Sequence, residues 1–462
     1  MKEQAIPFVS ILILWVINMI LKRKILCISN MIFAYYFFCF GGAIFVHLNP
    51  RTGFPFSDLN AMIYLSWAVG FLLLPLLFLK DTHFEPETLR TDFESLDRQR
   101  KKIWIIFFLL LYSEICFSPN LFRFFSFLSQ SMDREVFRLG IDRSLRNNIF
   151  LALAAFLLCF AKPALFLCIV YLLFGKTSDH RKVVIAMAIA SLAYPMWSLQ
   201  QIDRREIGKI IFMVMSLFVA FYYYFDPVKR KITLKYICIF LGLLLIPFVT
   251  LSIVRYQGDW LYQLLQYFAI GPYYFNADFV ANTEFGLPLF QGDYCFPLIS
   301  KPVHAMTGVE VPLTPEEMWM FPELHHQIYW QISQCHPFEF KTMVGCYILD
   351  FTPETAMHLL AGTGIVLSIF FRIKKYDFAY IFFMCIYSFT LLFGTIMFAF
   401  ASFIFNVELV MLIVIGFAMQ AFVDRGKRLL PEKMAADQQV PQNEEQKDAD
   451  IPESTSSEAV QP

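Results

Sequence analysis

Residues 255–279 read RYQGDWLYQLLQYFAIGPYYFNADF, and they open a stretch that closes with FEFKTMVGCYILDFTPE at residues 338–354. Hydrophobic segments flank the stretch 255–354 on both sides, yet no part of it is a secure membrane span. It holds eleven acidic residues against only Arg255, Lys301 and Lys341. Its abundance of Trp, Tyr, Phe and Pro argues against disorder, so the sequence predicts one large, ordered, acidic loop.

The composition on either side of this loop is that of a membrane protein. The chain has 462 residues, of which 58% are hydrophobic and 16% charged, and its mean hydropathy is +0.55. Soluble domains usually carry roughly 25% charged residues. The net charge is zero, so the chain lacks the basic footprint of a nucleic-acid-binding protein and we expect no nucleic-acid partner. The sequence predicts an all-α polytopic integral membrane protein.

Stretches of about 20 apolar residues predict about 11 transmembrane helices around the one large extracytoplasmic loop. Within the fifth of them, Lys162-Pro163 predicts a kink or a strong tilt. The predicted spans are 5–21, 25–46, 60–79, 103–118, 149–174, 183–200, 208–225, 236–254, 355–371, 378–400 and 404–423.

Basic residues fix the expected orientation, because cytoplasmic loops carry an excess of Lys and Arg. With eleven spans, five basic clusters fall on one side, at 22–24, 176–182, 229–235, 372–375 and 425–428. The loop 255–354 is then extracytoplasmic and the carboxyl terminus cytoplasmic. We expect a transmembrane domain over residues 1–423 and a disordered cytoplasmic tail over 424–462, where Gln, Glu, Asp, Ser and Pro dominate.

Several outer segments carry arginine against the positive-inside trend. Residues 119–148 include Arg134, Arg138 and Arg143 but no lysine, and Arg204, Arg205 and Arg255 sit at span ends beside the large loop. The planar guanidinium binds phosphate bidentately, which suits a lipid pyrophosphate at the membrane surface. The alternative is that these arginines pair with loop acids or reach lipid phosphates.

Ionisable groups also occur inside the apolar spans, where they are expensive and usually paired or functional. Glu114, Lys162 and Glu408 either line a substrate cavity or form an internal pair. In the loop, Glu323, His325, His326 and His336 match no zinc spacing. Cys295, Cys335 and Cys346 allow one disulfide if the loop faces an oxidising compartment.

Three stretches are similar to segments of a known family. They are QIDRREIGK at 201–209, which opens a span, Arg255 followed by YFAIGPYYFN at 267–276, and FKTMVGCYILDF at 340–351. Over roughly residues 100–420 the chain resembles the Wzy-type oligosaccharide repeat-unit polymerases, or O-antigen polymerases, of bacterial inner membranes. Asp203 stands where the family tends to place a serine before the arginine.

The resemblance implies a multi-pass glycosyltransferase of the bacterial inner membrane. Such proteins transfer a growing glycan from one undecaprenyl-pyrophosphate carrier to the sugar of another lipid-linked unit on the outer face. The implied partners are the undecaprenyl-pyrophosphate-linked oligosaccharide, the lipid bilayer and a chain-length regulator protein. Because the pyrophosphate leaving group supplies the energy, no nucleotide is needed. Because arginines would neutralise the leaving pyrophosphate, we expect metal-independent catalysis and no cofactor.

On this hypothesis, arginines stabilise the departing pyrophosphate, and a carboxylate or histidine deprotonates the acceptor hydroxyl. The predicted catalytic residues are Arg204, Arg205, Arg255 and Asp350. The predicted substrate-binding residues are Arg134, Arg138, Arg143, Asn276, His325 and His326. The sequence does not single out the general base.

Three alternatives remain: two are also membrane enzymes, and one is a transporter. An O-antigen ligase has a similar layout and differs only in its acceptor. A transporter or flippase of lipid-linked sugars predicts a cavity lined from both halves of the chain and needs no large outer loop. A membrane mannosyltransferase usually carries acidic pairs in its first outer loop, whereas residues 47–59 contain only Asp58 as an acid.

Overall fold

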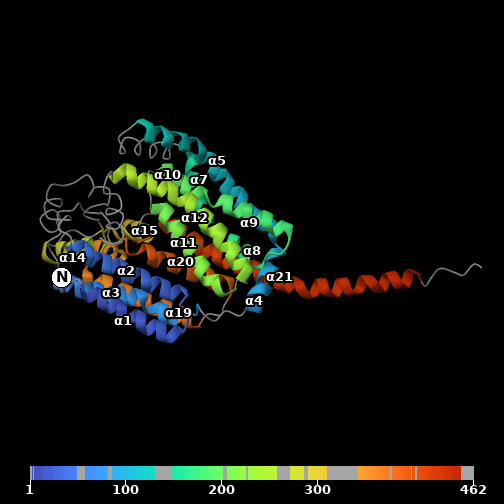
Figure 1. Ribbon diagram of the computed structural model, residues 1–462, viewed down its shortest axis with the longest axis horizontal. Helices are drawn as coiled ribbons and strands as arrows, with labels where there is room; N and C mark the ends of the chain where they lie inside the picture. The colour runs from blue at the N-terminus through green and yellow to red at the C-terminus, as the bar shows by residue number, and fades with distance from the viewer. Residues whose placement is uncertain are drawn as a thin grey trace, which may run out of the picture.

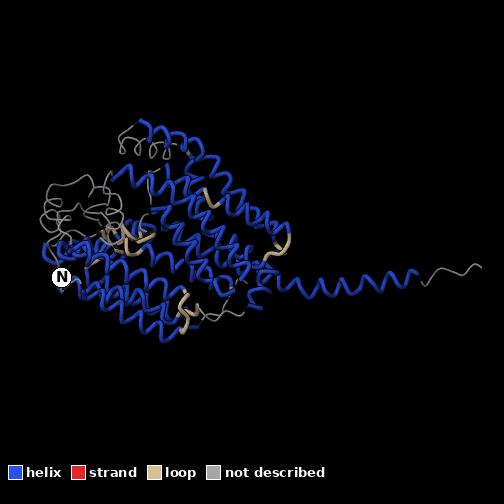
Figure 2. Tube along the Cα trace, in the orientation of Figure 1, coloured by secondary structure: helices blue, strands red, loops and turns tan. Residues whose placement is uncertain are grey.

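The computed structural model describes most of the chain, and the described part consists of helices joined by loops and turns (Figure 2). The hydrophobic stretches therefore form helices, as the sequence predicts for membrane spans, in which the backbone must satisfy its own hydrogen bonds. The described residues are 3, 5–48, 58–81, 86–130, 148–200, 205–224, 227–256, 271–285, 290–309, 342–373, 377–396, 398–400 and 403–448.

Most of the helices pack side by side as one bundle (Figure 1). In the first half they are α1 Ala5–Lys22, α2 Ile28–Leu48, α3 Leu59–Phe78, α4 Pro86–Asp97, α5 Arg100–Gln130, α7 Ile149–Leu157, α8 Ala161–Phe174, α9 Ser178–Ala190 and α10 Ala193–Gln200. In the second half they are α11 Arg205–Phe221, α12 Pro227–Tyr256, α14 Gly271–Phe285, α15 Pro297–Thr307, α18 Met343–Asp350, α19 Pro353–Ile373, α20 Phe378–Phe393 and α21 Phe403–Asp448. Short 3-10 turns, Leu158–Phe160 and Tyr222–Tyr224, follow α7 and α11.

A polytopic membrane protein is supported, with eight candidate spans in the described part rather than the predicted eleven. The eight segments are Ala5–Lys22, Ile28–Phe45, Leu59–Phe78, Arg100–Pro119, Ile149–Phe174, Ile207–Tyr224, Pro353–Arg372 and Phe405–Arg428. The predicted span 183–200 is split between α9 and α10, and 378–400 yields only the shorter α20. The predicted span 236–254 lies within α12, a 30-residue helix whose side chains are described only in part.

The predicted kink in the fifth span is present as a break. The 3-10 turn Leu158–Phe160 separates α7 from α8, immediately before Lys162 and Pro163. Proline lacks a backbone N–H, and its ring clashes with the carbonyl four residues earlier, here that of Cys159. The distortion therefore falls in the turn preceding the proline.

Basic clusters that are far apart in the sequence meet at one end of the bundle, which we call the inner end. Lys427 of α21 pairs with Asp92 of α4 there. His180, in the first turn of α9, contacts Asp97 at 3.0 Å between Nε2 and Oδ2. The predicted orientation depends on successive loops alternating between the two ends of the bundle. These contacts agree with that alternation. We call the opposite end, where α3 and α19 begin, the outer end.

Three short helices lie toward the outer end and come from the predicted large loop. Helix α14 packs against α2, α3 and α18, and α18 continues into α19 with only Phe351 and Thr352 between them. Helix α15 packs against α21. We call α14, α15, α18 and the turn 290–296 the outer cap.

The carboxyl-terminal segment, for which the sequence predicts disorder, is helical as far as Asp448. Figure 1 shows this part of α21 extending away from the bundle. Its residues include Glu, Lys, Ala and Gln, which favour helix over coil. The helix propensity of these residues thus extends α21 beyond the segment predicted to span the membrane.

Candidate functional site

The outer cap is built around a turn that folds back on the end of α18. The N–H of Phe290 donates to the carbonyl of Leu349 at 3.0 Å, and the N–H of Gln291 to that of Asp350 at 2.9 Å. Gln291 and Gly292 both have left-handed backbones, with φ of 51° and 98°. Glycine suits position 292 because an added Cβ would lie 3.0 Å from Cβ of Ser300.

Asp350, a predicted catalytic residue, holds this turn through its side chain. Its carboxylate accepts the N–H of Tyr294 at 2.9 Å and that of Cys295 at 2.6 Å. The residue is only 1% exposed. Burial raises its pKa from 3.8 to about 6, although the bonds from the backbone N–H groups favour the charged form. Both oxygens are thus engaged by the fold, and a catalytic role remains a prediction.

A histidine and an acid that the sequence did not single out lie beside this turn. His304 Nδ1 is 3.4 Å from Oδ1 of Asp293, and the two side chains are 14% and 7% exposed. The Ser300 hydroxyl, one helical turn before His304 on α15, donates to the same carboxylate oxygen. The imidazole therefore lies beside a carboxylate that Ser300 holds in place.

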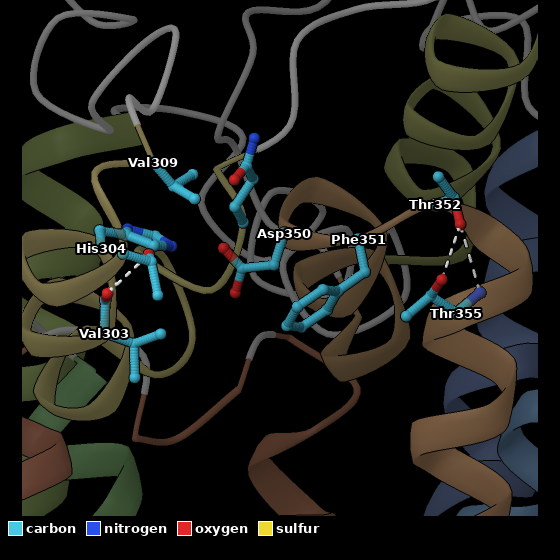
Figure 3. Close-up of a pocket in the computed structure, with 9 residues that line it drawn as sticks. Val303, His304, Val309, Asp350, Phe351, Thr352 and Thr355 are labelled. Atoms are coloured by element: carbon cyan, nitrogen blue, oxygen red, sulfur yellow. Dashed lines mark hydrogen bonds between the residues drawn. The ribbon is translucent and has the colours of Figure 1, made fainter.

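A cavity of about 450 Å³ opens beside this pair. The described residues that line it are Gln291, Val303, His304, Thr307, Val309, Asp350, Phe351, Thr352 and Thr355. Figure 3 shows His304, Val303 and Val309 on one side, Thr352 and Thr355 on the other, and Asp350 and Phe351 between them. The cavity therefore lies between α15 and the junction of α18 with α19.

Most of the predicted site residues lie where the structure gives no side-chain detail. Arg134, Arg138, Arg143, Arg204, His325 and His326 lie outside the described residues. Two further arginines have a described backbone only: Arg205 is the first residue of α11, and Arg255 precedes the last residue of α12. The roles predicted for all these residues remain predictions.

Asn276, predicted to bind substrate, is buried in α14. Its Oδ1 accepts the N–H of Asp58 at 2.9 Å, and Asp58 in turn caps the first turn of α3. The residue is not among those that line the cavity. This contact gives Asn276 a role in joining α14 to α3, and the predicted substrate contact is untested.

A second polar cluster lies inside the bundle, and it settles the alternatives for two span residues. Lys162 pairs with Oε1 of Glu408. The Tyr194 hydroxyl accepts a bond from Lys162 at 3.2 Å and donates to Oε2 of Glu408 at 3.3 Å. Lys162 and Glu408 thus form an internal pair, which we call, with Tyr194, the buried triad. Glu114 is not part of it, and its Oε1 is buried without a hydrogen bond in the described structure.

Two cysteines of the large loop, Cys295 and Cys346, are buried in the outer cap as free thiols. Burial raises the pKa of Cys295, and the neighbouring Asp350 carboxylate adds to this effect. Cys335 lies outside the described residues. A thiol with a raised pKa is a poor nucleophile, so Cys295 behaves as a core residue, and Cys346 is equally buried.

No metal-binding group of three or more His, Cys, Asp or Glu residues occurs among the residues that the structure describes. The expected absence of a metal or cofactor remains a prediction, because much of the acidic loop lies outside those residues. Comparisons of the chain with known protein families, with curated proteins and with solved structures find no match.

Proposed function

We propose that this chain is a membrane glycosyltransferase that polymerises undecaprenyl-pyrophosphate-linked oligosaccharide units on the outer face of the bacterial inner membrane. The observation that carries the proposal is the cavity beside His304 and Asp293 at the outer end of the bundle. A general base for a sugar hydroxyl needs a proton-accepting group in a pocket and a partner that stabilises its charged form. His304 and Asp293 meet both needs.

In the proposed reaction, His304 removes the proton from a hydroxyl of the acceptor sugar. That oxygen forms a bond to the anomeric carbon of the donor glycan. The bond between this carbon and the pyrophosphate oxygen breaks, and undecaprenyl pyrophosphate leaves with the electron pair. Asp293 stabilises the imidazolium that forms, because its carboxylate lies 3.4 Å from Nδ1.

The leaving group requires a cationic partner, for which the predicted arginines remain the candidates. Helices α11 and α12 pack against each other. Arg205 begins α11 and Arg255 lies in the last turn of α12, so the two positions fall at the same end of an antiparallel pair. This arrangement supports a shared phosphate site near the outer surface.

The proposal is tested by reconstituting the purified chain with synthetic lipid-linked repeat units and following the polymer ladder on gels. We expect His304→Ala to slow elongation roughly 10²- to 10⁴-fold, the range that a general base contributes. Lys301→Ala is the matched control, because Lys301 lies on the same helix, is exposed and does not line the cavity.

Full-rate elongation by His304→Ala would remove this residue from the chemistry. The same assay separates polymerase from ligase, because a ligase would use the lipid A core as acceptor and make no ladder.

One observation favours a transporter or flippase as a second candidate. Two interrupted helix pairs, α7–α8 and α9–α10, place Lys162 and Tyr194 within four residues of their breaks. Discontinuous helices that meet at buried charges are typical of transport sites. Vesicles that hold a fluorescent lipid-linked sugar would show transbilayer movement only if this candidate is right.

A further inference from the structure

We infer that the cavity beside His304 binds an uncharged sugar, a hexose or N-acetylhexosamine, and disfavours acidic sugars and the pyrophosphate. The inference rests on the proposed function in assigning this sugar to the acceptor glycan. It goes further by naming the chemical class that the lining selects.

The lining combines an apolar surface with uncharged hydrogen-bonding groups. Val303, Val309 and Phe351 provide carbon surface on which the C–H face of a pyranose ring can pack. Thr355 accepts a bond from the Thr352 hydroxyl at 3.0 Å, which leaves its own proton for a ligand. The Gln291 amide adds a donor and an acceptor, as hydroxyl-rich ligands require.

In the described part of the chain, acidic residues outnumber lysine and arginine around the cavity. None of the nine lining residues is a lysine or arginine, and the basic residue of α15, Lys301, is exposed outside the lining. Asp350 lines the cavity, and Asp293 lies behind His304. A carboxylate or phosphate placed here would meet no lysine or arginine among the described lining residues. The basic side chain of the lining, His304, already faces Asp293, and the anion would approach buried acids.

The volume fits a small ligand rather than a whole repeat unit. About 450 Å³ lies within the roughly 300–1,000 Å³ of small-molecule sites. The cavity is therefore large enough to bind the acceptor sugar alone. The anionic pyrophosphate of the carrier lipid must bind elsewhere. The positions of Arg205 and Arg255 at the ends of α11 and α12 offer a separate place for it.

The experiment measures binding, so its outcome is independent of turnover. The full chain, in nanodiscs of zwitterionic phosphatidylcholine, is titrated with methyl glycosides of glucose, galactose, mannose and the two N-acetylhexosamines. Each hexoside is paired with its uronic acid, which differs only by a carboxylate at C6. Saturation-transfer NMR gives the dissociation constants. We expect at least one neutral glycoside to bind, at least tenfold more tightly than its acidic counterpart where that pair exists.

Two variants test whether the sugar binds in the cavity and whether charge causes the discrimination against uronates. Phe351→Ala should weaken the neutral sugar severalfold, and Thr355→Lys should bring the affinity for the uronate severalfold closer to that for the neutral sugar. Ala305→Lys adds the same charge on α15 at an exposed position outside the lining, and it should change neither affinity.

Two results would overturn the inference: binding of the uronates as tight as that of the neutral sugars, or no binding of any neutral glycoside. Selective binding of neutral sugars by a chain that makes no polymer would refute the proposed polymerase and leave the selectivity of the cavity standing. Polymerisation by a chain whose cavity prefers uronates would do the reverse.

Discussion

The cavity of the outer cap and the buried triad each place a basic side chain beside a carboxylate, but in different surroundings. At the cavity, His304 and Asp293 lie 3.4 Å apart and the imidazole is partly exposed. In the triad, Lys162 is 0% exposed, the Tyr194 hydroxyl contacts both charged groups, and the rings of Tyr194 and Phe389 lie 4.5 and 5.2 Å from the ammonium. One pair is open to a ligand, and the other is closed by protein.

The difference in exposure gives the two pairs of basic and acidic side chains different roles. A partly exposed histidine can exchange its proton with a substrate, because water and ligand reach it. A buried ion pair in a bundle has no such access, and its desolvation opposes its Coulomb attraction. We therefore assign the proposed chemistry to the cavity, and to the triad the joining of α8, α10 and α21.

The largest expected effect comes from leaving one charge of the triad unpaired. Lys162→Met should destabilise the protein by about 3–5 kcal/mol, because Glu408 would stay buried without its partner. The double variant Lys162→Met with Glu408→Leu should recover most of this loss, since apolar side chains replace a buried pair at little cost. Thermal unfolding in detergent measures both.

If Lys162→Met were as stable as the natural chain, water would have to reach Glu408, and the pair would not be fully buried. A double variant that folds but no longer moves a lipid-linked sugar across the bilayer would favour the transporter instead.

The next effect concerns the pH dependence of the outer cap. Burial raises the pKa of Asp350 from 3.8 to about 6, so the folded chain binds this proton more tightly than the unfolded chain. The stabilisation from this proton is fully present below about pH 4 and is lost as the pH rises through 6. It amounts to about 3 kcal/mol, at 1.36 kcal/mol for each pKa unit.

The measurement is the unfolding free energy from pH 4 to 7 for the natural chain and for Asp350→Asn. The variant should lose this part of the pH slope, and equal slopes would show that Asp350 does not titrate in this range.

The smallest expected effect tests the link between the two regions. Asn406 of α21, two residues before Glu408, donates to the carbonyls of Cys295 and Phe400 at 2.7 Å each. Asn406→Leu should cost about 1–3 kcal/mol, the net contribution of two such bonds. Amide hydrogen exchange should rise in the turn 290–296 and stay unchanged in α3.

Thr283→Val is the control, because the Thr283 hydroxyl is exposed and donates to the carbonyl of Phe279 in its own helix. Equal exchange rates in Asn406→Leu and the natural chain would mean that the turn is held without α21.

Particular residues show how far sequence reasoning reached into the candidate site. Lys162 and Glu408 were identifiable because a charge in an apolar span is rare, but their pairing spans 246 positions and depends on packing. His304 was not identifiable, since nothing near it in the sequence distinguishes it from the three other histidines of the loop. Asp350 was predicted as catalytic, but the sequence did not indicate that its carboxylate accepts hydrogen bonds from the backbone N–H groups of Tyr294 and Cys295.

The amino-acid sequence by itself determined the helical membrane character and the positions of most apolar spans. Both features follow from the hydropathy and charge of each segment, which decide whether that segment enters a membrane. Only the tertiary structure decided which acid faces which base, that α9 and α10 are separate helices, and that α14, α15 and α18 form the outer cap. Those outcomes depend on contacts between segments far apart in the chain, and no local pattern of residues encodes them.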